Sequence, residues 1–238
     1  MSRYSQLLQR AEGMRPEITP VDEVGDGANG YASSREPLLE MDLAIQEEIA
    51  KMVHRVFLST SRSRSVIFSG ADHGAGCSWI TACAADILAR RGAGSVCAVD
   101  ATGSRPNVLD YLGVRNGFGS KVNGAQPVSD SLWVSSLRRT SSPLQDSAHD
   151  TEARDHLLEL RDQFEYVLID APPMRSGGDA TALAHDADGL VLVLEASVTH
   201  RETARQAVRD VTAANARVLG AVLNKRKFPI PAGIYNKL

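Results

Sequence analysis

The chain has 238 residues, of which 43% are hydrophobic and 23% charged, and its formal net charge is −3. This length and balance are typical of a globular domain with its own core. The near-neutral charge argues against a nucleic-acid partner, which would favour a basic surface. No apolar run approaches the ~20 residues that cross a membrane and no secretory signal pattern opens the chain, so we expect a cytoplasmic protein. The three cysteines show no CxxC spacing and predict neither a disulfide framework nor a zinc site.

The beginning of the chain differs in composition from the rest. Residues 1–13, MSRYSQLLQRAEG, can place their apolar side chains on one helical face, which predicts a docking helix or, alternatively, a frayed terminus. Residues 14–38 mix proline, glycine, serine and acidic residues without apolar periodicity, as linkers do. The folded domain is therefore predicted to span residues 39–238.

A regular pattern begins at residue 41. The stretch MDLAIQEEIAKMVHRVFLSTS has apolar residues at helical spacing, which predicts an amphipathic helix that leads into the core. The residues predicted to face the core are Ile45, Ile49, Met52, Val53 and Val56.

Short β-branched runs and helical segments then alternate. Strands are predicted at 65–70, 95–101, 131–137, 166–173, 189–196 and 217–224. Helices are predicted at 78–91, 151–163, 179–186 and 200–215. Most strands are nearly continuous in apolar residues, as strands buried on both faces are. The alternation predicts a three-layer α/β/α domain, with a mostly parallel sheet flanked by helices and its functional residues at the carboxyl ends of the strands.

The first of these strand ends carries a glycine-rich turn, SGADHGAGCS, at residues 69–78. A glycine-rich turn that opens a helix exposes several backbone N–H groups, and the helix dipole adds partial positive charge, so the turn favours anions. We expect Gly74, Ala75, Gly76, Cys77 and Ser78 to contact phosphate. Ser78 stands where a phosphate-binding loop places its magnesium-ligating hydroxyl.

The match to the phosphate-loop pattern G-x-x-x-x-G-K-[ST] is broken at two positions. Cys77 stands where the lysine is expected, and the first glycine is displaced by one residue, to Gly70. The context supports the assignment, since two further strands end in Asp100 and Asp170 and should meet at the same edge. Both aspartates are catalytic candidates, and Asp170 is also a candidate magnesium ligand.

In chain order, the motifs GxGxS, VDAxxxRP, YVLIDAPP and VLGAVLN resemble those of the cytoplasmic bacterial tyrosine kinases of capsule and exopolysaccharide synthesis, relatives of the septum-site and partition ATPases. The resemblance covers residues 40 to 238. It implies a P-loop NTPase-like fold that uses ATP or ADP with Mg²⁺. It also implies self-association and work beside a membrane-embedded polysaccharide co-polymerase, a chain-length regulator that would hold the protein peripherally at the inner face of the membrane.

The resemblance also assigns residues. Ser78, Asp100 and Asp170 match the family pattern, and Asn224 matches an asparagine that can face the adenine. Thr102 departs from it, because it replaces a second aspartate of the acidic motif. The carboxyl-terminal tail offers only Tyr235 instead of a cluster of tyrosines that accept phosphate.

The cysteine at position 77 is the departure with the largest expected effect. Losing one charged hydrogen bond to a phosphate costs about 1.5–3 kcal/mol of binding. Removing one preorganised donor from phosphoryl transfer costs about 10²–10³ in rate. No nearby lysine is apparent as a substitute, and His73 and Arg105 are the only local cation candidates. We therefore predict a regulatory or scaffold protein of polysaccharide biosynthesis with weak or absent kinase activity.

Three other interpretations stay open from the sequence. The chain can be an active ATP-dependent tyrosine kinase or ATPase that takes its missing cation from a neighbouring subunit. It can be a dinucleotide-binding enzyme, with GAGCSW as the glycine motif and Asp100 reading the ribose, although Trp79 replaces the third glycine. Finally, Cys77 at a helix N-terminus can be a reactive thiol with a lowered pKa.

Overall fold

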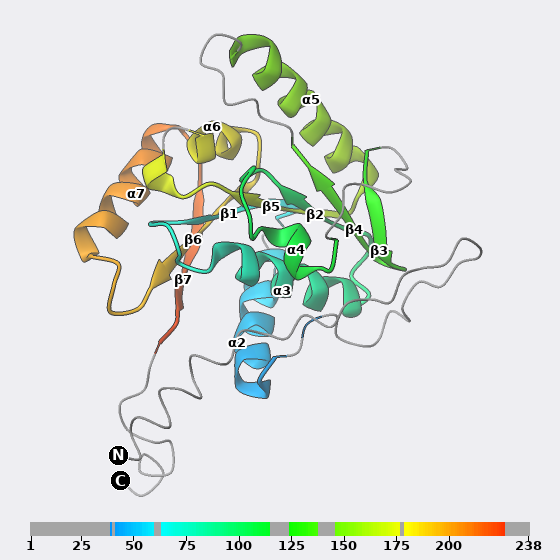
Figure 1. The fold of residues 1–238 in the computed structure, drawn as a ribbon, viewed down its shortest axis with the longest axis horizontal. Coiled ribbons are helices and arrows are strands. Elements are labelled where there is room, and N and C mark those ends of the chain that lie inside the picture. The colour runs from blue at the N-terminus through cyan, green and yellow to red at the C-terminus, as the bar shows by residue number, and fades with distance from the viewer. Residues whose placement is uncertain are drawn as a thin grey trace, which may run out of the picture. The chain divides into compact units, whose positions relative to one another are not determined.

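Figure 1 shows a computed structural model of the chain, which describes residues 39, 41–59, 63–114, 124–137, 146–176 and 179–226. The predicted docking helix, the predicted linker and Tyr235 lie outside the described residues. The limits of the folded domain stay a prediction for the same reason.

The described part of the chain contains a seven-stranded sheet. Its strands are β1 (Ser65–Gly70), β2 (Val96–Asp100), β3 (Gln126–Ser129), β4 (Leu132–Ser136), β5 (Tyr166–Ala171), β6 (Gly189–Glu195) and β7 (Val218–Asn224). They lie in the order β3-β4-β2-β5-β1-β6-β7, and only the β3–β4 pair is antiparallel. The prediction of a mostly parallel sheet is confirmed, whereas β3 was not predicted.

Helices cover both faces of the sheet. They are α2 (Leu43–Val53) with a π-helical continuation (His54–Leu58), α3 (Cys77–Arg90), α4 (Val108–Tyr111), α5 (Asp146–Gln163), a 3-10 turn (Met174–Ser176), α6 (Asp179–His185) and α7 (Arg201–Ala213). One hydrophobic cluster joins α2, α3 and α4 to one face, and a second joins α5, α6 and α7 to the other. Figure 1 shows the two sets of helices on opposite sides of the sheet. The three-layer prediction is therefore confirmed.

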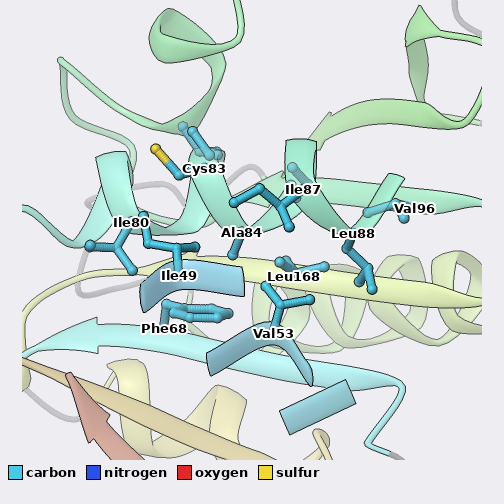
Figure 2. Packing of buried hydrophobic residues seen from close by; sticks show 14 of the residues in the cluster. Ile49, Val53, Phe68, Ile80, Cys83, Ala84, Ile87, Leu88, Val96 and Leu168 are labelled. Atoms are coloured by element: carbon cyan, nitrogen blue, oxygen red, sulfur yellow. The ribbon is translucent and has the colours of Figure 1, made fainter. Parts of the chain in front are cut away.

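Alternation along the central strands divides the core between these two clusters. In β1, Val66 and Phe68 belong to the cluster with α2 and α3, whereas Ile67 belongs to the other, and all of them are fully buried. Side chains of a strand point alternately to opposite faces, so a run that is apolar at every position feeds both layers. Figure 2 shows Phe68 of β1 beside Ile49 and Val53 of α2, in the same cluster as residues of α3.

The first described helix only partly matches its prediction. Ile49 and Val53 are buried, as expected, but Ile45 is 43% exposed, so its assignment to the core is wrong. The buried residues of α2 lie in its later turns, and the first turn, which holds Ile45, stands in solvent. In the π-helical continuation, Phe57 is fully buried and meets the Tyr166 ring edge-on, with 5.9 Å between ring centroids.

Candidate functional site

The predicted phosphate loop lies between the end of β1 and the start of α3. Gly74 has φ +78° and Gly76 has φ +83°, and this left-handed backbone favours glycine. Gly76 is also the N-cap of the fourteen-residue helix α3. The N–H groups of residues 76–78 donate to no other described residue. The free N–H groups and the dipole of α3 therefore make this loop suited to an anion.

The two predicted aspartates meet at the carboxyl edge of the sheet, because Asp100 of β2 is paired in register with Asp170 of β5. The Asp100 carboxylate is already occupied by local hydrogen bonds. It accepts from the Thr102 N–H at 2.9 Å, the Thr102 hydroxyl at 2.6 Å and the Asn107 side-chain amide at 2.8 Å. These bonds hold the loop that follows β2 and leave Asp100 poorly suited to reading a ribose, so the dinucleotide interpretation gains no support.

Asp170 is in the opposite situation. It is fully buried, and neither carboxylate oxygen has a hydrogen-bond partner among the described residues. Burial raises the pKa of Asp170 from 3.8 to about 7, and the charge of Asp100 adds to this rise. The Ser78 hydroxyl, the Cys77 thiol and the Val108 N–H lie near enough to oppose the rise, although none of them makes a hydrogen bond of good geometry to the carboxyl oxygens. An unpartnered buried carboxyl group is costly. The prediction that Asp170 and Ser78 hold a cation stays a prediction, and the structure places the two residues near each other.

The thiol of Cys77 lies beside this carboxyl group. Burial raises the pKa of Cys77 well above its usual value, and the negative charge of Asp170 adds to the effect. The alternative interpretation of a reactive thiol with a lowered pKa therefore gains no support. The dipole of α3 favours a thiolate, but loss of hydration and an adjacent carboxyl group outweigh it here.

The predicted substitute cations are engaged elsewhere. The Arg105 guanidinium lies 2.7 Å from the Asp110 carboxylate, and His73 Nε2 lies 2.9 Å from the Ser176 hydroxyl. Within the loop, the carboxylate of Asp72 pairs with Arg175 at 3.3 Å. This ion pair offsets the negative charge that Asp72 brings to the loop.

A lysine that the sequence analysis did not single out lies against the loop. Lys225 Nζ donates to the Gly74 carbonyl at 2.6 Å and lies 3.1 Å from the Glu195 carboxylate. Beside it, the Asn224 side-chain amide donates to the Ala75 carbonyl at 2.8 Å. The run NKRK, which contains Lys225, comes at the end of the last strand. Because the carboxyl ends of parallel strands share one edge, this position could have indicated a lysine near the loop.

The described residues contain no group of three or more His, Cys, Asp or Glu side chains arranged to hold a metal ion. For Mg²⁺ the predicted ligands Ser78 and Asp170 do come together, as the opposing effects on the Asp170 pKa show. A cavity of about 270 Å³ lies beside the loop that follows β2, and Asp100, Arg105 and Asn107 are among its lining residues. Within the described ranges, no helix has the length and apolar character to cross a membrane.

Comparison with known proteins finds relatives among bacterial tyrosine-protein kinases. No protein-family model matches the chain. It is 28% identical over 185 residues to the tyrosine-protein kinase YwqD of Bacillus subtilis, which covers 72% of this chain and 77% of YwqD. This chain is homologous to bacterial tyrosine-protein kinases. This chain also shares 36% identity over 67 residues with the putative tyrosine-protein kinase CapB of Staphylococcus aureus. That match covers 28% of this chain and 29% of CapB.

Solved structures agree on the fold of this kinase homologue. The kinase domain of Escherichia coli tyrosine kinase ETK superposes with a TM-score of 0.61 at 20% identity, covering 74% of this chain and 73% of ETK's. A ParA family ATPase from Chlorobium tepidum superposes with a TM-score of 0.54 at 18% identity, over 68% of this chain and 74% of its own. The P-loop NTPase-like fold predicted from the motifs is confirmed.

Proposed function

We propose that this kinase homologue is a regulatory or scaffold component of exopolysaccharide or capsule biosynthesis, with weak or absent kinase activity. The observation that carries the proposal is the environment of position 77. There a neutral thiol lies beside a buried carboxyl group that has no hydrogen-bond partner among the described residues. Phosphoryl transfer depends on positioned positive charge at the transferred phosphate, and a loop lysine supplies part of that charge in P-loop enzymes.

The cations around the loop do not restore this charge. Arg105, Arg175 and Lys225 each form an ion pair with a neighbouring carboxylate. The Lys225 ammonium group binds the Gly74 carbonyl and the Glu195 carboxylate, whereas Cys77 lies beside Asp170. The site therefore keeps the backbone of a phosphate loop and lacks its central cation.

Nucleotide binding is part of the proposal, in a weakened form. ATP or ADP would be held by the backbone of residues 74–78, with the adenine toward Asn224. Ser78 and Asp170 would hold Mg²⁺, which supplies positive charge to the phosphates when it is bound. The unpartnered oxygens of Asp170 support this assignment. Losing the lysine is expected to weaken nucleotide binding about 10- to 150-fold.

The proposed partner is a membrane-embedded polysaccharide co-polymerase, through which a cytoplasmic protein would lie at the inner face of the membrane. The similarity to the kinases CapB and YwqD supports the family resemblance, which implies both this partner and self-association. Co-purification of the full chain with the co-polymerase encoded in the same genome tests the partner, and recovery of neither protein with the other would refute it.

The enzymatic part is tested by magnesium-dependent ATP turnover and tyrosine phosphorylation in wild type, Cys77→Lys and Asp170→Asn. We expect wild type to be indistinguishable from Asp170→Asn, and Cys77→Lys to gain turnover. The alternative, an active kinase that takes a cation from a neighbouring subunit, requires wild-type turnover that Asp170→Asn abolishes. That result would overturn the proposal of impaired activity.

A further inference from the structure

We infer that Lys225 and Asn224, at the end of β7, are positioning residues that keep the loop of residues 74–78 shaped for a phosphate group although Cys77 has replaced the lysine. The inference rests on the proposed function, because it concerns the same loop. It assigns to the last strand a role in binding the phosphates, in addition to the adenine contact expected of Asn224.

The first step is the direction of the loop carbonyls. Lys225 Nζ holds the Gly74 carbonyl at 2.6 Å, and the Asn224 amide holds the Ala75 carbonyl at 2.8 Å. Both oxygens therefore face β7. A carbonyl oxygen turned into the loop would repel a phosphate, and these two bonds prevent that.

The second step is the direction of the N–H groups. In a planar trans peptide the C=O and N–H bonds point in opposite directions. Tying the Ala75 carbonyl to Asn224 turns the Gly76 N–H away from β7, toward the side where α3 begins. The N–H groups of Gly76 and of the next two residues have no acceptor among the described residues. They are the donors that an anion would meet.

The third step is an independent sign that something binds at this helix end. Asp170 is fully buried beside Cys77 and Ser78, and both its oxygens lack a partner among the described residues. A folded chain tolerates such a group where a ligand completes its contacts, which a cation with a bound phosphate would do.

We call the two hydrogen bonds from Lys225 and Asn224 to the loop carbonyls the clamp, and the backbone at the end of β7 has an unusual conformation beside it. Lys225 has φ +57°, which is uncommon for a residue other than glycine, asparagine or aspartate. Its N–H is held by the Asn224 side-chain oxygen at 2.8 Å. On the loop side, a Cβ at Gly76 would lie 2.4 Å from the Asn224 amide nitrogen, so only glycine fits there without a shift of Asn224. Strand end and loop thus fit each other in one conformation.

Glu195 allows a test in which anion binding is expected to become stronger instead of weaker. Its carboxylate lies 3.1 Å from Lys225 Nζ and offsets the charge that would otherwise favour an anion in the loop. Removing this carboxylate without disturbing the lysine is expected to strengthen anion binding, whereas removing the lysine is expected to weaken it. A purely structural role for the pair predicts loss in both cases.

The experiment is isothermal titration of the full-length protein with magnesium pyrophosphate and, separately, magnesium ADP. Pyrophosphate has no base, so it reports on the loop alone. We expect Lys225→Ala to weaken both ligands about 10-fold, the effect of one charge-assisted hydrogen bond. Lys225→Arg should recover most of this loss, Asn224→Ala should weaken pyrophosphate as well as ADP, and Glu195→Gln should strengthen both about 3-fold.

Lys51→Ala is the matched control, because Lys51 is also an exposed lysine that pairs with one glutamate, Glu48 at 2.6 Å. It should leave both affinities unchanged. Thermal unfolding of each variant shows whether the fold is retained. Weakening of ADP alone by Lys225→Ala would mean a contact with the base and would overturn the inference, as would unchanged binding of both ligands.

The same titrations in a Cys77→Lys background separate this inference from the proposed function. If wild type is silent and Cys77→Lys binds, the effect of Lys225→Ala is measured there, and its absence refutes the clamp. If neither background binds pyrophosphate or ADP, the loop is no anion site and the inference fails. Wild-type ATP turnover, by contrast, would refute impaired activity and leave the clamp intact.

Discussion

Replacing Asp170 by asparagine is expected to stabilise the protein at alkaline pH. Burial raises the pKa of Asp170 from 3.8 to about 7, so the folded chain keeps this proton in a range where the unfolded chain has lost it. Between those pH values the folded state binds more protons, and the free energy of unfolding therefore falls as pH rises. Above pH 7 the full cost of burying the charge is present, and below pH 3.8 it is absent.

The size of the effect follows from the same two values. The interval from 3.8 to about 7 corresponds to about 4 kcal/mol, at 1.36 kcal/mol per pKa unit. Part of this loss is already present at pH 5, so about 3 kcal/mol should be lost between pH 5 and pH 8. An asparagine also leaves a buried polar group without a partner, at about 1–3 kcal/mol, but that cost does not change with pH.

The measurement is urea unfolding of wild type and Asp170→Asn at pH 5 and pH 8, with the free energy of unfolding extrapolated to water. We expect the variant to gain about 3 kcal/mol on wild type across this interval. Asp100→Asn is the control: its carboxylate accepts three hydrogen bonds, so that variant should be less stable than wild type at pH 8. Parallel pH profiles for wild type and Asp170→Asn would show that Asp170 has a counter-cation in the folded protein, and would refute the reasoning.

Three further predictions concern the loop and the core. The thiol of Cys77, with its pKa raised by burial, should react with iodoacetamide at neutral pH about 10-fold or more slowly than free cysteine, as followed by peptide mass spectrometry; faster labelling would restore the reactive interpretation. Gly76→Ala should lower the unfolding free energy by about 1–2 kcal/mol more than Gly103→Ala. Both glycines have positive φ, but only at Gly76 would a Cβ meet another atom within 4 Å, so equal losses would contradict this. Val53→Ala should cost about 2 kcal/mol and Ile45→Ala less than about 1, since the first is fully buried and the second 43% exposed; similar losses would place the first turn of α2 in the core.

The sequence predicts the sheet well because its signal is local. Strands such as β1 and β5 are apolar at nearly every position, which only burial on both faces explains. β3 was missed because QPVS is short and contains a proline, a residue confined to edges and bulges, and it pairs only with the adjacent β4. The helix α4, four residues long, depends on a capping box between Asn107 and Asp110 instead of on apolar periodicity.

The backbone of the candidate site was also predictable, whereas its charges were not. The glycines and Ser78 follow β1, the two aspartates lie at the ends of β2 and β5, and the carboxyl ends of parallel strands converge. The contact between Lys225 and Gly74 joins residues 151 positions apart. It depends on β7 lying beside β6 and β6 beside β1, an order that apolar patterns do not specify. The raised pKa of Cys77 was not predictable, because a sequence shows that the residue opens a helix but does not show the loss of hydration around its thiol.

Position 77 and Asp170 are one electrostatic unit, so a single substitution should change both stability and binding. A lysine at 77 would place a cation beside the buried carboxyl group, lower the Asp170 pKa and remove the fall in stability between pH 5 and pH 8. The same charge would raise the affinity for magnesium ADP. Urea unfolding and titration of Cys77→Lys measure the two effects separately.

If the pH dependence disappears and the affinity rises, the neutral thiol explains the weakened loop. If the pH dependence disappears and the affinity does not rise, the lysine pairs with Asp170 without reaching the phosphates, and the loop geometry held by β7 limits binding. If neither changes, Cys77 and Asp170 are not coupled and this account of the site is wrong.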